Sequence, residues 1–168
     1  VGSEMCIRDS AAPVQWALIN GEATTGLTVF QLDRGMDTGP VLDQREYPLP
    51  KKDAGDMLEE FAHAGAQQLT EALTRLENGD ATLVPQSGEA TYAPKLSAQD
   101  AHLNFALPAC ELVARSHGVS PMPGPWSTMD GKRTKLAGLS ETDIHVPAGE
   151  IREHDGQILI GTGTTAVR

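Results

Sequence analysis

The sequence contains few aromatic residues, few cysteines and few basic residues. Only 4% of its 168 residues are aromatic, whereas 17 are glycine and 11 are proline, which predicts a loop-rich fold with a modest hydrophobic core. The 13 basic residues are outnumbered by 23 acidic ones, giving a net charge of −10. This balance argues against a globally basic nucleic-acid-binding protein, although a local basic patch stays compatible with it.

Cysteines and long apolar runs are also scarce. The two cysteines, Cys6 and Cys110, are too few for a disulfide framework, and neither lies in a C-x-x-C metal-binding pair. No stretch of the sequence approaches the roughly 18 apolar residues that a membrane span needs, and the first residues lack the layout of a secretory signal. We therefore expect a cytoplasmic protein with no metal site and no membrane contact.

The first ten residues, Val1–Ser10, differ in character from the rest of the chain. They show no periodicity, and the pattern changes at Ala11. We interpret them as an artefactual segment that does not belong to the fold. The alternative is a frayed native terminus.

Residues 11–79 alternate between helical and extended patterns. The sequence predicts a helix from Pro13 to Asn20-Gly21, strands at 27–32 and 41–47, and a long helix from an N-cap at Asp53 to Asn78-Gly79. This order indicates the second half of an α/β domain. Two strands are too few to complete such a domain, so we expect exposed apolar strand edges and marginal stability or poor solubility.

The remaining residues form a polar linker, 80–91, and a second domain, 92–168. In the second domain the sequence predicts a helix at 108–116 and short strands at 126–129, 134–137 and 157–160, with Asp130-Gly131 as a hairpin turn. Charge divides at the same place, because residues 1–91 carry 15 acidic and 6 basic side chains and residues 92–168 carry 8 and 7. We expect a small, mostly-β, barrel-like domain that stops early.

The densest chemical signal is the loop at residues 31–40, directly after a predicted strand. Ligands of open α/β sheets bind just beyond the carboxyl ends of strands. Gly35 and Gly39 would let the backbone approach a flat ligand, and a lone carboxylate could orient a base. The alternative is a turn whose aspartates cap backbone N–H groups.

Several motifs resemble those of the folate-dependent formyltransferases. These are Ala11-Ala12-Pro13-Val14-Gln15, Gly26-Leu27-Thr28-Val29 and Gly35-Met36-Asp37-Thr38-Gly39-Pro40. Two more resemble the C-terminal module of the methionyl-tRNA formyltransferases: Thr91-Tyr92-Ala93-Pro94-Lys95-Leu96-Ser97 and Ser120-Pro121-Met122-Pro123-Gly124-Pro125-Trp126. The resemblance runs from Ala11 to the end, with the motifs in the expected order.

The resemblance implies a fold and a reaction. The fold would be the C-terminal half of a Rossmann-like formyltransferase domain followed by an OB-like barrel, in a protein that is a monomer when full length. The enzyme would transfer a formyl group from 10-formyltetrahydrofolate to the amino group of methionyl-initiator tRNA, in translation initiation. No metal would be involved.

The resemblance also assigns roles to individual residues. The catalytic Asp of the family's D-T-G-P motif matches Asp37. It would orient and charge a His that, together with an Asn, stabilises the tetrahedral oxyanion. The folate-contacting residues would be Asp33, Arg34, Gly35 and Met36. The residues that contact tRNA phosphates would be Lys132, Arg133 and Lys135, for which a solvated hairpin face is the alternative.

The chain departs from the family pattern just before Ala11. The Asn-x-His loop and the S-L-L-P segment of the family are not found in Val1–Ser10, and none of the histidines stands at the matching position. The histidines are His63, on the predicted long helix, and His102, His117, His145 and His154, which lie in the C-terminal part with no carboxylate constellation. We therefore expect an incomplete and inactive fragment.

Three other interpretations were weighed against this one. The chain could be a non-catalytic module that binds RNA or a protein partner. It could also be a formyltransferase that acts on another amine, such as a sugar nucleotide, although residues 91–97 and 120–126 argue against this. The Gly161–Ala166 segment fits a G-x-G-x-x-A dinucleotide pattern, but the helix that such a site needs does not follow, so a β-turn is expected there.

Overall fold

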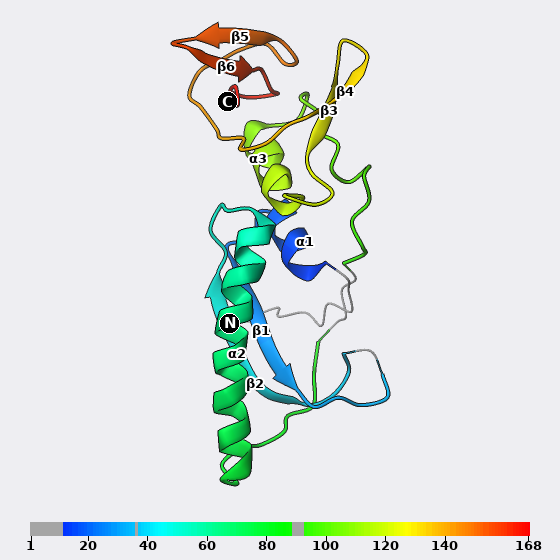
Figure 1. Cartoon of the computed structure of the whole chain (residues 1–168), viewed down its shortest axis with the longest axis vertical. Coiled ribbons are helices and arrows are strands. Elements are labelled where there is room, and N and C mark those ends of the chain that lie inside the picture. The colour runs from blue at the N-terminus through cyan, green and yellow to red at the C-terminus, as the bar shows by residue number, and fades with distance from the viewer. Residues whose placement is uncertain (1–11, 36, 89–92) are drawn as a thin grey trace. The chain divides into compact units, whose positions relative to one another are not determined.

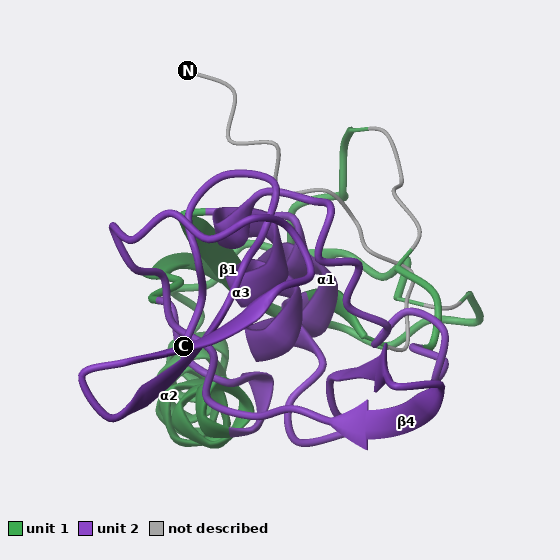
Figure 2. Ribbon diagram, turned by 90° about the horizontal axis from the view of Figure 1, so that it is seen from above, with its two compact units in different colours: residues 1–13, 23–50, 56–95 green, residues 14–22, 51–55, 96–168 purple. Residues whose placement is uncertain are grey.

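The computed structural model describes residues 12–35, 37–88 and 93–168. The chain divides into two compact units, neither of which is continuous in sequence (Figure 2). Unit 1 contains the described residues of 1–13, 23–50 and 56–95, and unit 2 contains residues 14–22, 51–55 and 96–168. The expected domain limits at 79, 80 and 91 stay a prediction.

Unit 1 is an antiparallel hairpin with a long helix beside it (Figure 1). Strand β1 (Thr24–Phe30) pairs with β2 (Val41–Pro48), with an irregularity between Val29 and Phe30. The helix is α2 (Ala54–Glu77, of which Ala54 and Gly55 belong to unit 2), and its buried residues within unit 1 are Met57, Phe61, Gln68 and Ala72. The rings of Phe61 and Tyr47 pack at 5.9 Å, so the apolar contact reaches from helix to strand.

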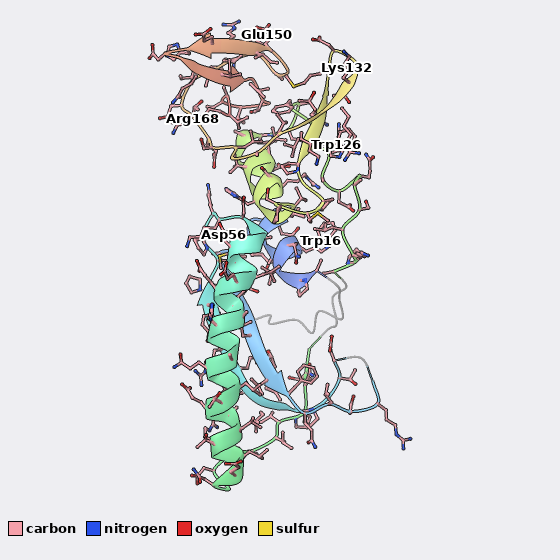
Figure 3. The ribbon with its side chains drawn as sticks, in the orientation of Figure 1. Trp16, Asp56, Trp126, Lys132, Glu150 and Arg168 are labelled. Atoms are coloured by element: carbon pink, nitrogen blue, oxygen red, sulfur yellow. The ribbon has the colours of Figure 1, made fainter. Side chains whose placement is uncertain are left out.

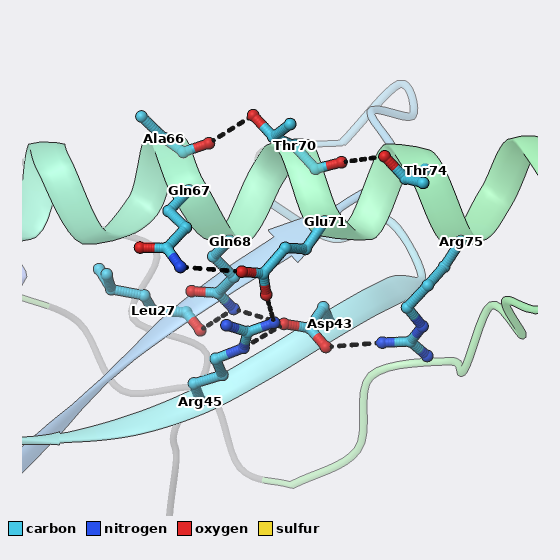
Figure 4. Close-up of polar contacts among 10 residues, drawn as sticks. All are labelled: Leu27, Asp43, Arg45, Ala66, Gln67, Gln68, Thr70, Glu71, Thr74 and Arg75. Carbon is cyan, nitrogen blue, oxygen red and sulfur yellow. Dashed lines mark hydrogen bonds and ion pairs between the residues drawn. The ribbon is translucent and has the colours of Figure 1, made fainter.

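A polar network centred on Asp43 joins the hairpin to the helix (Figure 4). The carboxylate of Asp43 accepts hydrogen bonds from Arg45 (2.8 Å), Gln68 (3.0 Å) and Arg75 (3.0 Å). Gln68 is fully buried, and its amide also donates to the carbonyl of Leu27 (3.1 Å). One side chain of α2 therefore contacts both strands.

The outer edge of this network is an ion pair between Arg45 and Glu71. The guanidinium of Arg45 lies 2.7 Å from a Glu71 oxygen, whose carboxylate also accepts from Gln67 at 2.9 Å. The hydrogen bond from Arg45 lowers the pKa of Glu71, and the same bond raises the pKa of Arg45. Both side chains are partly exposed, whereas Asp43 is more buried and Gln68 is fully buried, so we expect these two to contribute more to stability than the outer ion pair.

Unit 2 contains two short helices and two hairpins. They are α1 (Pro13–Ile19, of which Pro13 belongs to unit 1), α3 (Ala109–Gly118), β3 (Trp126–Met129) with β4 (Lys132–Lys135), and β5 (Ile151–His154) with β6 (Gln157–Ile160). Its core groups Leu103, Leu112, Val113, Ile160 and Val167 around α3. Within the described part of unit 2 these strands form separate hairpins and no closed sheet, so the OB-like barrel stays a prediction.

Most elements predicted from the sequence are confirmed. The short helix, the second strand, the long helix and the strand at 157–160 lie where they were expected, while β1 and β4 begin earlier than predicted. The turn at Asp130-Gly131 is confirmed, because both residues have positive φ, 50° and 74°. Strand β5 was missed, although Asp155-Gly156 gives the same hairpin signal.

None of the described helices is long and apolar enough to cross a membrane.

Asp43→Ala should destabilise the chain by about 1–3 kcal/mol, because it leaves the buried amide of Gln68 without one of its acceptors. Urea unfolding of the 168-residue chain measures this change. Glu46→Ala is the matched control, since Glu46 is exposed on the same strand. Equal unfolding midpoints for the two variants would contradict a structural role for Asp43.

Candidate functional site

The loop that follows β1 is anchored at its base. The Gln31 N–H donates to the carbonyl of Pro40 (2.9 Å), which closes residues 31–40, here called the Asp37 loop, across its neck. Gly39 is buried at this neck, and a Cβ on it would collide with the backbone carbonyl of Gln31. Glycine is therefore required at position 39 by close backbone approach.

The side chain of Asp33 makes hydrogen bonds within the Asp37 loop. Its Oδ1 accepts hydrogen bonds from the Gly35 N–H (2.9 Å) and from the hydroxyl of Thr38 (2.8 Å). This is the backbone-capping role that the sequence left as an alternative for the aspartates of this loop. The exposed residues Arg34 and Gly35 follow it, and Met36 lies outside the described residues.

Asp37 differs from Asp33 in having an uncommitted side chain. The residue is exposed and adopts a left-handed backbone with φ of 55°, a conformation that few non-glycine residues take. Its carboxylate makes no hydrogen bond or ion pair with any other described residue. The loop thus holds Asp37 in an uncommon backbone conformation, and none of the other described residues engages its carboxylate.

The linker contributes a residue to this loop that the sequence did not single out. The amide of Gln86 donates to the carbonyls of Asp37 (2.7 Å) and Gly39 (2.6 Å). Two residues earlier, Val84 forms a two-bond bridge with Val41 at the start of β2 (2.7 and 2.8 Å). A polar segment with no periodicity gives no signal for such contacts, so only the structure shows them.

The three basic residues predicted to contact tRNA phosphates, Lys132, Arg133 and Lys135, all lie on β4 of hairpin β3–β4, on which Figure 3 labels Lys132 and Trp126. Trp126 pairs with Lys135 in the strand register, and neighbouring residues of a strand point to opposite faces. Arg133 and Lys135 therefore share the face of Trp126, while Lys132 lies on the face of the buried Ser127. The three cations predicted as one cluster are divided between two faces.

The Trp126 ring is held in place rather than free for stacking. The guanidinium of Arg133 lies 4.3 Å from the ring centroid, and the indole N–H donates to the carbonyl of Ala98 (2.6 Å). The ring of His102 packs against its edge at 4.7 Å. Trp126 thus supports the hairpin, and Arg133 is ordered by it.

The expectation that the four C-terminal histidines lack carboxylate partners is wrong for two of them, since His154 Nε2 lies 3.5 Å from an oxygen of the adjacent Asp155. His117 does have a carboxylate partner, since its Nδ1 lies 2.8 Å from an Asp53 oxygen within unit 2. The partner is distant in sequence, which is why no local motif indicated it. Within residues 12–35, 37–88 and 93–168 there is no group of three or more side chains that could hold a metal ion.

Comparison with known families identifies the class of protein. Residues 9–73 match the formyl transferase family, and residues 95–168 match the formyl transferase C-terminal domain. The chain therefore belongs to the formyl transferase family.

The similar curated proteins are methionyl-tRNA formyltransferases. The one from Paenarthrobacter aurescens is 42% identical over 160 residues, which is 94% of this chain and 52% of the relative. The one from Leifsonia xyli is 42% identical over 156 residues, or 92% of this chain and 52% of the relative. The chain thus spans about half the length of these relatives.

Solved structures share the fold at lower identity. HypX from Aquifex aeolicus in complex with tetrahydrofolic acid has a TM-score of 0.77 at 23% identity and covers 94% of this chain and 28% of that one. An N-formyltransferase from Helicobacter canadensis, in complex with folinic acid and dTDP-3-aminofucose, has a TM-score of 0.74 at 17% identity. The match covers 96% of this chain and 60% of that one. These likenesses support the Rossmann-like formyltransferase fold predicted for residues 11–79.

Gly39→Ala should destabilise the chain by more than about 1 kcal/mol, because the new methyl group collides with a backbone carbonyl that cannot rotate away. Gly65→Ala is the matched control within unit 1. Its Cβ would meet only Leu27 at 3.9 Å, and alanine in a helix interior is favoured by about 0.5–1 kcal/mol. Urea unfolding should therefore give shifts of opposite sign, and a stabilised Gly39→Ala variant would refute the close approach.

Proposed function

We propose that this chain is part of a methionyl-tRNA formyltransferase, which transfers a formyl group from 10-formyltetrahydrofolate to the amino group of methionyl-initiator tRNA. The observation that carries the proposal is the uncommitted, exposed carboxylate of Asp37 at a loop whose sequence fits the family motif. Identity of 36–42% to curated methionyl-tRNA formyltransferases over 94% of the chain supports the choice of acceptor. The structural similarity to the N-formyltransferase solved with dTDP-3-aminofucose, at 17% identity, supports the fold alone.

In this mechanism Asp37 acts on the proton and the imidazole rather than on the formyl group. Attack of the methionyl amine on the formyl carbon builds negative charge on the carbonyl oxygen, which an Asn and a protonated His of the upstream catalytic loop would stabilise. Collapse of this tetrahedral intermediate would break the bond between the formyl carbon and N10 of the folate, which takes up a proton and leaves as tetrahydrofolate. The Asp37 carboxylate would orient that His, keep it charged, and assist removal of the proton from the attacking amine. An unpaired carboxylate suits this role, because a committed one would have to break its bonds first.

Folate contact is proposed for the neighbouring residues Asp33, Arg34, Gly35 and Met36. Because Asp33 Oδ1 is used within the loop, its contribution would be to shape the backbone that approaches the pterin ring. We further propose that residues 92–168 form the tRNA-side, OB-like module, joined through residues 80–91. The full protein would act as a cytoplasmic monomer in translation initiation.

For the tRNA the proposed contacts are Arg133 and Lys135, which share one face of the hairpin β3–β4. Phosphate contacts by Arg and Lys position a nucleic acid without reading its sequence. Lys132 was proposed with them from the sequence, and its place on the other face makes it the natural comparison.

The 168-residue chain alone should not formylate methionyl-tRNA, because no histidine contacts Asp37 among the described residues. Joining the preceding part of the Paenarthrobacter aurescens enzyme to residue 12 of this chain should give an active protein. In that joined protein, Asp37→Asn should lower kcat by about a hundredfold or more, as loss of a group that orients a catalytic His does. A formylation assay with methionyl-tRNA and 10-formyltetrahydrofolate measures the activity of the chain alone, of the joined protein and of its Asp37→Asn variant.

Leu83→Ala in the joined protein serves as the control for general effects of substitution in unit 1. Formylation by the chain alone, or full activity of the Asp37→Asn variant, would refute the proposed role of Asp37.

Arg133→Ala and Lys135→Ala should each weaken binding of initiator tRNA to the joined protein about threefold and reduce the salt dependence of binding by about one phosphate contact. Lys132→Ala should have a smaller effect on both. Fluorescence anisotropy at several salt concentrations measures the tRNA affinity of each variant. Equal effects of all three substitutions would contradict the assignment of tRNA contacts to the face of Arg133 and Lys135.

A further inference from the structure

The carbonyl oxygens on either side of the catalytic turn share a single external donor. Gln86 donates to Asp37 O at 2.7 Å and to Gly39 O at 2.6 Å, so one amide nitrogen bridges the turn that contains Asp37. Gln86 is half-buried and Gly39 is buried, whereas Asp37 and Thr38 are exposed. The bridge therefore fixes the backbone at the residue whose side chain is meant to act.

The position of Gln86 is itself fixed by the preceding residues. Val84 and Val41 exchange two backbone hydrogen bonds, so this part of the linker runs beside the start of β2. The backbone position from which the Gln86 side chain extends is thus set by the hairpin and not by the loop. The Asp37 loop has internal hydrogen bonds to Asp33 and a closed neck, and Gln86 ties its second half, at Asp37 and Gly39, to the rest of unit 1.

We propose that Gln86 is a positioning residue for formyl transfer: it holds the left-handed backbone at Asp37 and so aims the carboxylate. This inference rests on the proposed function. A left-handed aspartate has easily accessible alternatives, because most non-glycine residues prefer negative φ. Two hydrogen bonds from an uncharged amide, to the carbonyls of Asp37 and Gly39, restrict those alternatives without engaging the carboxylate.

The role is specific to an N–H donor of the right length. A carboxylate at position 86 would face two carbonyl oxygens and repel them, while a thioether of equal length would leave them unpaired. A lysine at this position keeps a donor of similar reach. These three replacements therefore separate the hydrogen bonds from the volume of the side chain.

The first experiment measures backbone order without any activity. Hydrogen exchange of the 168-residue chain should be about tenfold faster at residues 35–41 in Gln86→Met and Gln86→Glu, and close to wild type in Gln86→Lys. Gln44→Met is the matched control, since Gln44 makes one exposed side-chain hydrogen bond to Thr28 on the same hairpin. Unchanged exchange at residues 35–41 in Gln86→Met would overturn the proposal.

The second experiment uses the active joined protein. Gln86→Met should lower kcat about tenfold while the KM for methionyl-tRNA changes less than about twofold, because misplacing a catalytic group acts on the reaction step. Gln86→Lys should recover most of kcat, and Gln44→Met should match the wild type. Equal losses in kcat for Gln86→Met and Gln44→Met, or no recovery by lysine, would overturn the positioning role.

The two experiments also separate this inference from the proposed function. Faster exchange in Gln86→Met together with no formylation by the joined wild type would support the anchoring of the loop and reject the function. Formylation that is lost in Asp37→Asn but unaffected by Gln86→Met would support the function and reject the inference.

Discussion

Unit 1 depends on the carboxylate of Asp43. A two-stranded hairpin is marginal on its own in water, and β1–β2 gains its support from α2 through three donors on one carboxylate and a fully buried amide at Gln68. Since Gln68 also bonds Leu27, the network fixes both strands against the helix. The Asp37 loop joins Phe30 of β1 to Val41 of β2, and Asp43 pairs with Val29 beside it, so the network holds the end of the hairpin from which the loop leaves.

The loop itself combines two kinds of restraint. Internal hydrogen bonds to Asp33 and the close approach at Gly39 set its shape, while Gln86 holds the backbone from Asp37 to Gly39. None of these uses the carboxylate of Asp37. Constraint of the backbone and freedom of the side chain are what a residue needs if it must meet an imidazole supplied from another part of the protein.

The sequence predicted what is encoded locally. Helical spacing, the Asn-Gly ends and the Asp-Gly turn identified α2 and the hairpin β3–β4, and the D-T-G-P motif identified Asp37. Contacts between distant residues could not be predicted this way. Gln86 lies 49 positions from Asp37 and His117 lies 64 from Asp53, and a hydrogen bond of a single polar side chain leaves no periodic signal. The sequence places Lys132 beside Arg133, but successive side chains of a strand point to opposite faces, so the two do not share a surface.

The discontinuity of unit 2 bears on how homologous genes can be recombined. Helix α3 meets α1 at Gly118, where a Cβ would collide with the Gln15 carbonyl and the Ile19 side chain, and Gly55 donates to Ser120 at 3.2 Å. If a crossover between two homologous genes lay in the polar stretch after residue 79, the two sides of each of these contacts would come from different parent proteins. Shuffled libraries should therefore inherit residues 14–22 and 51–55 from the parent that supplies residues 96–168, even though the stretch between them looks like the natural place to cut.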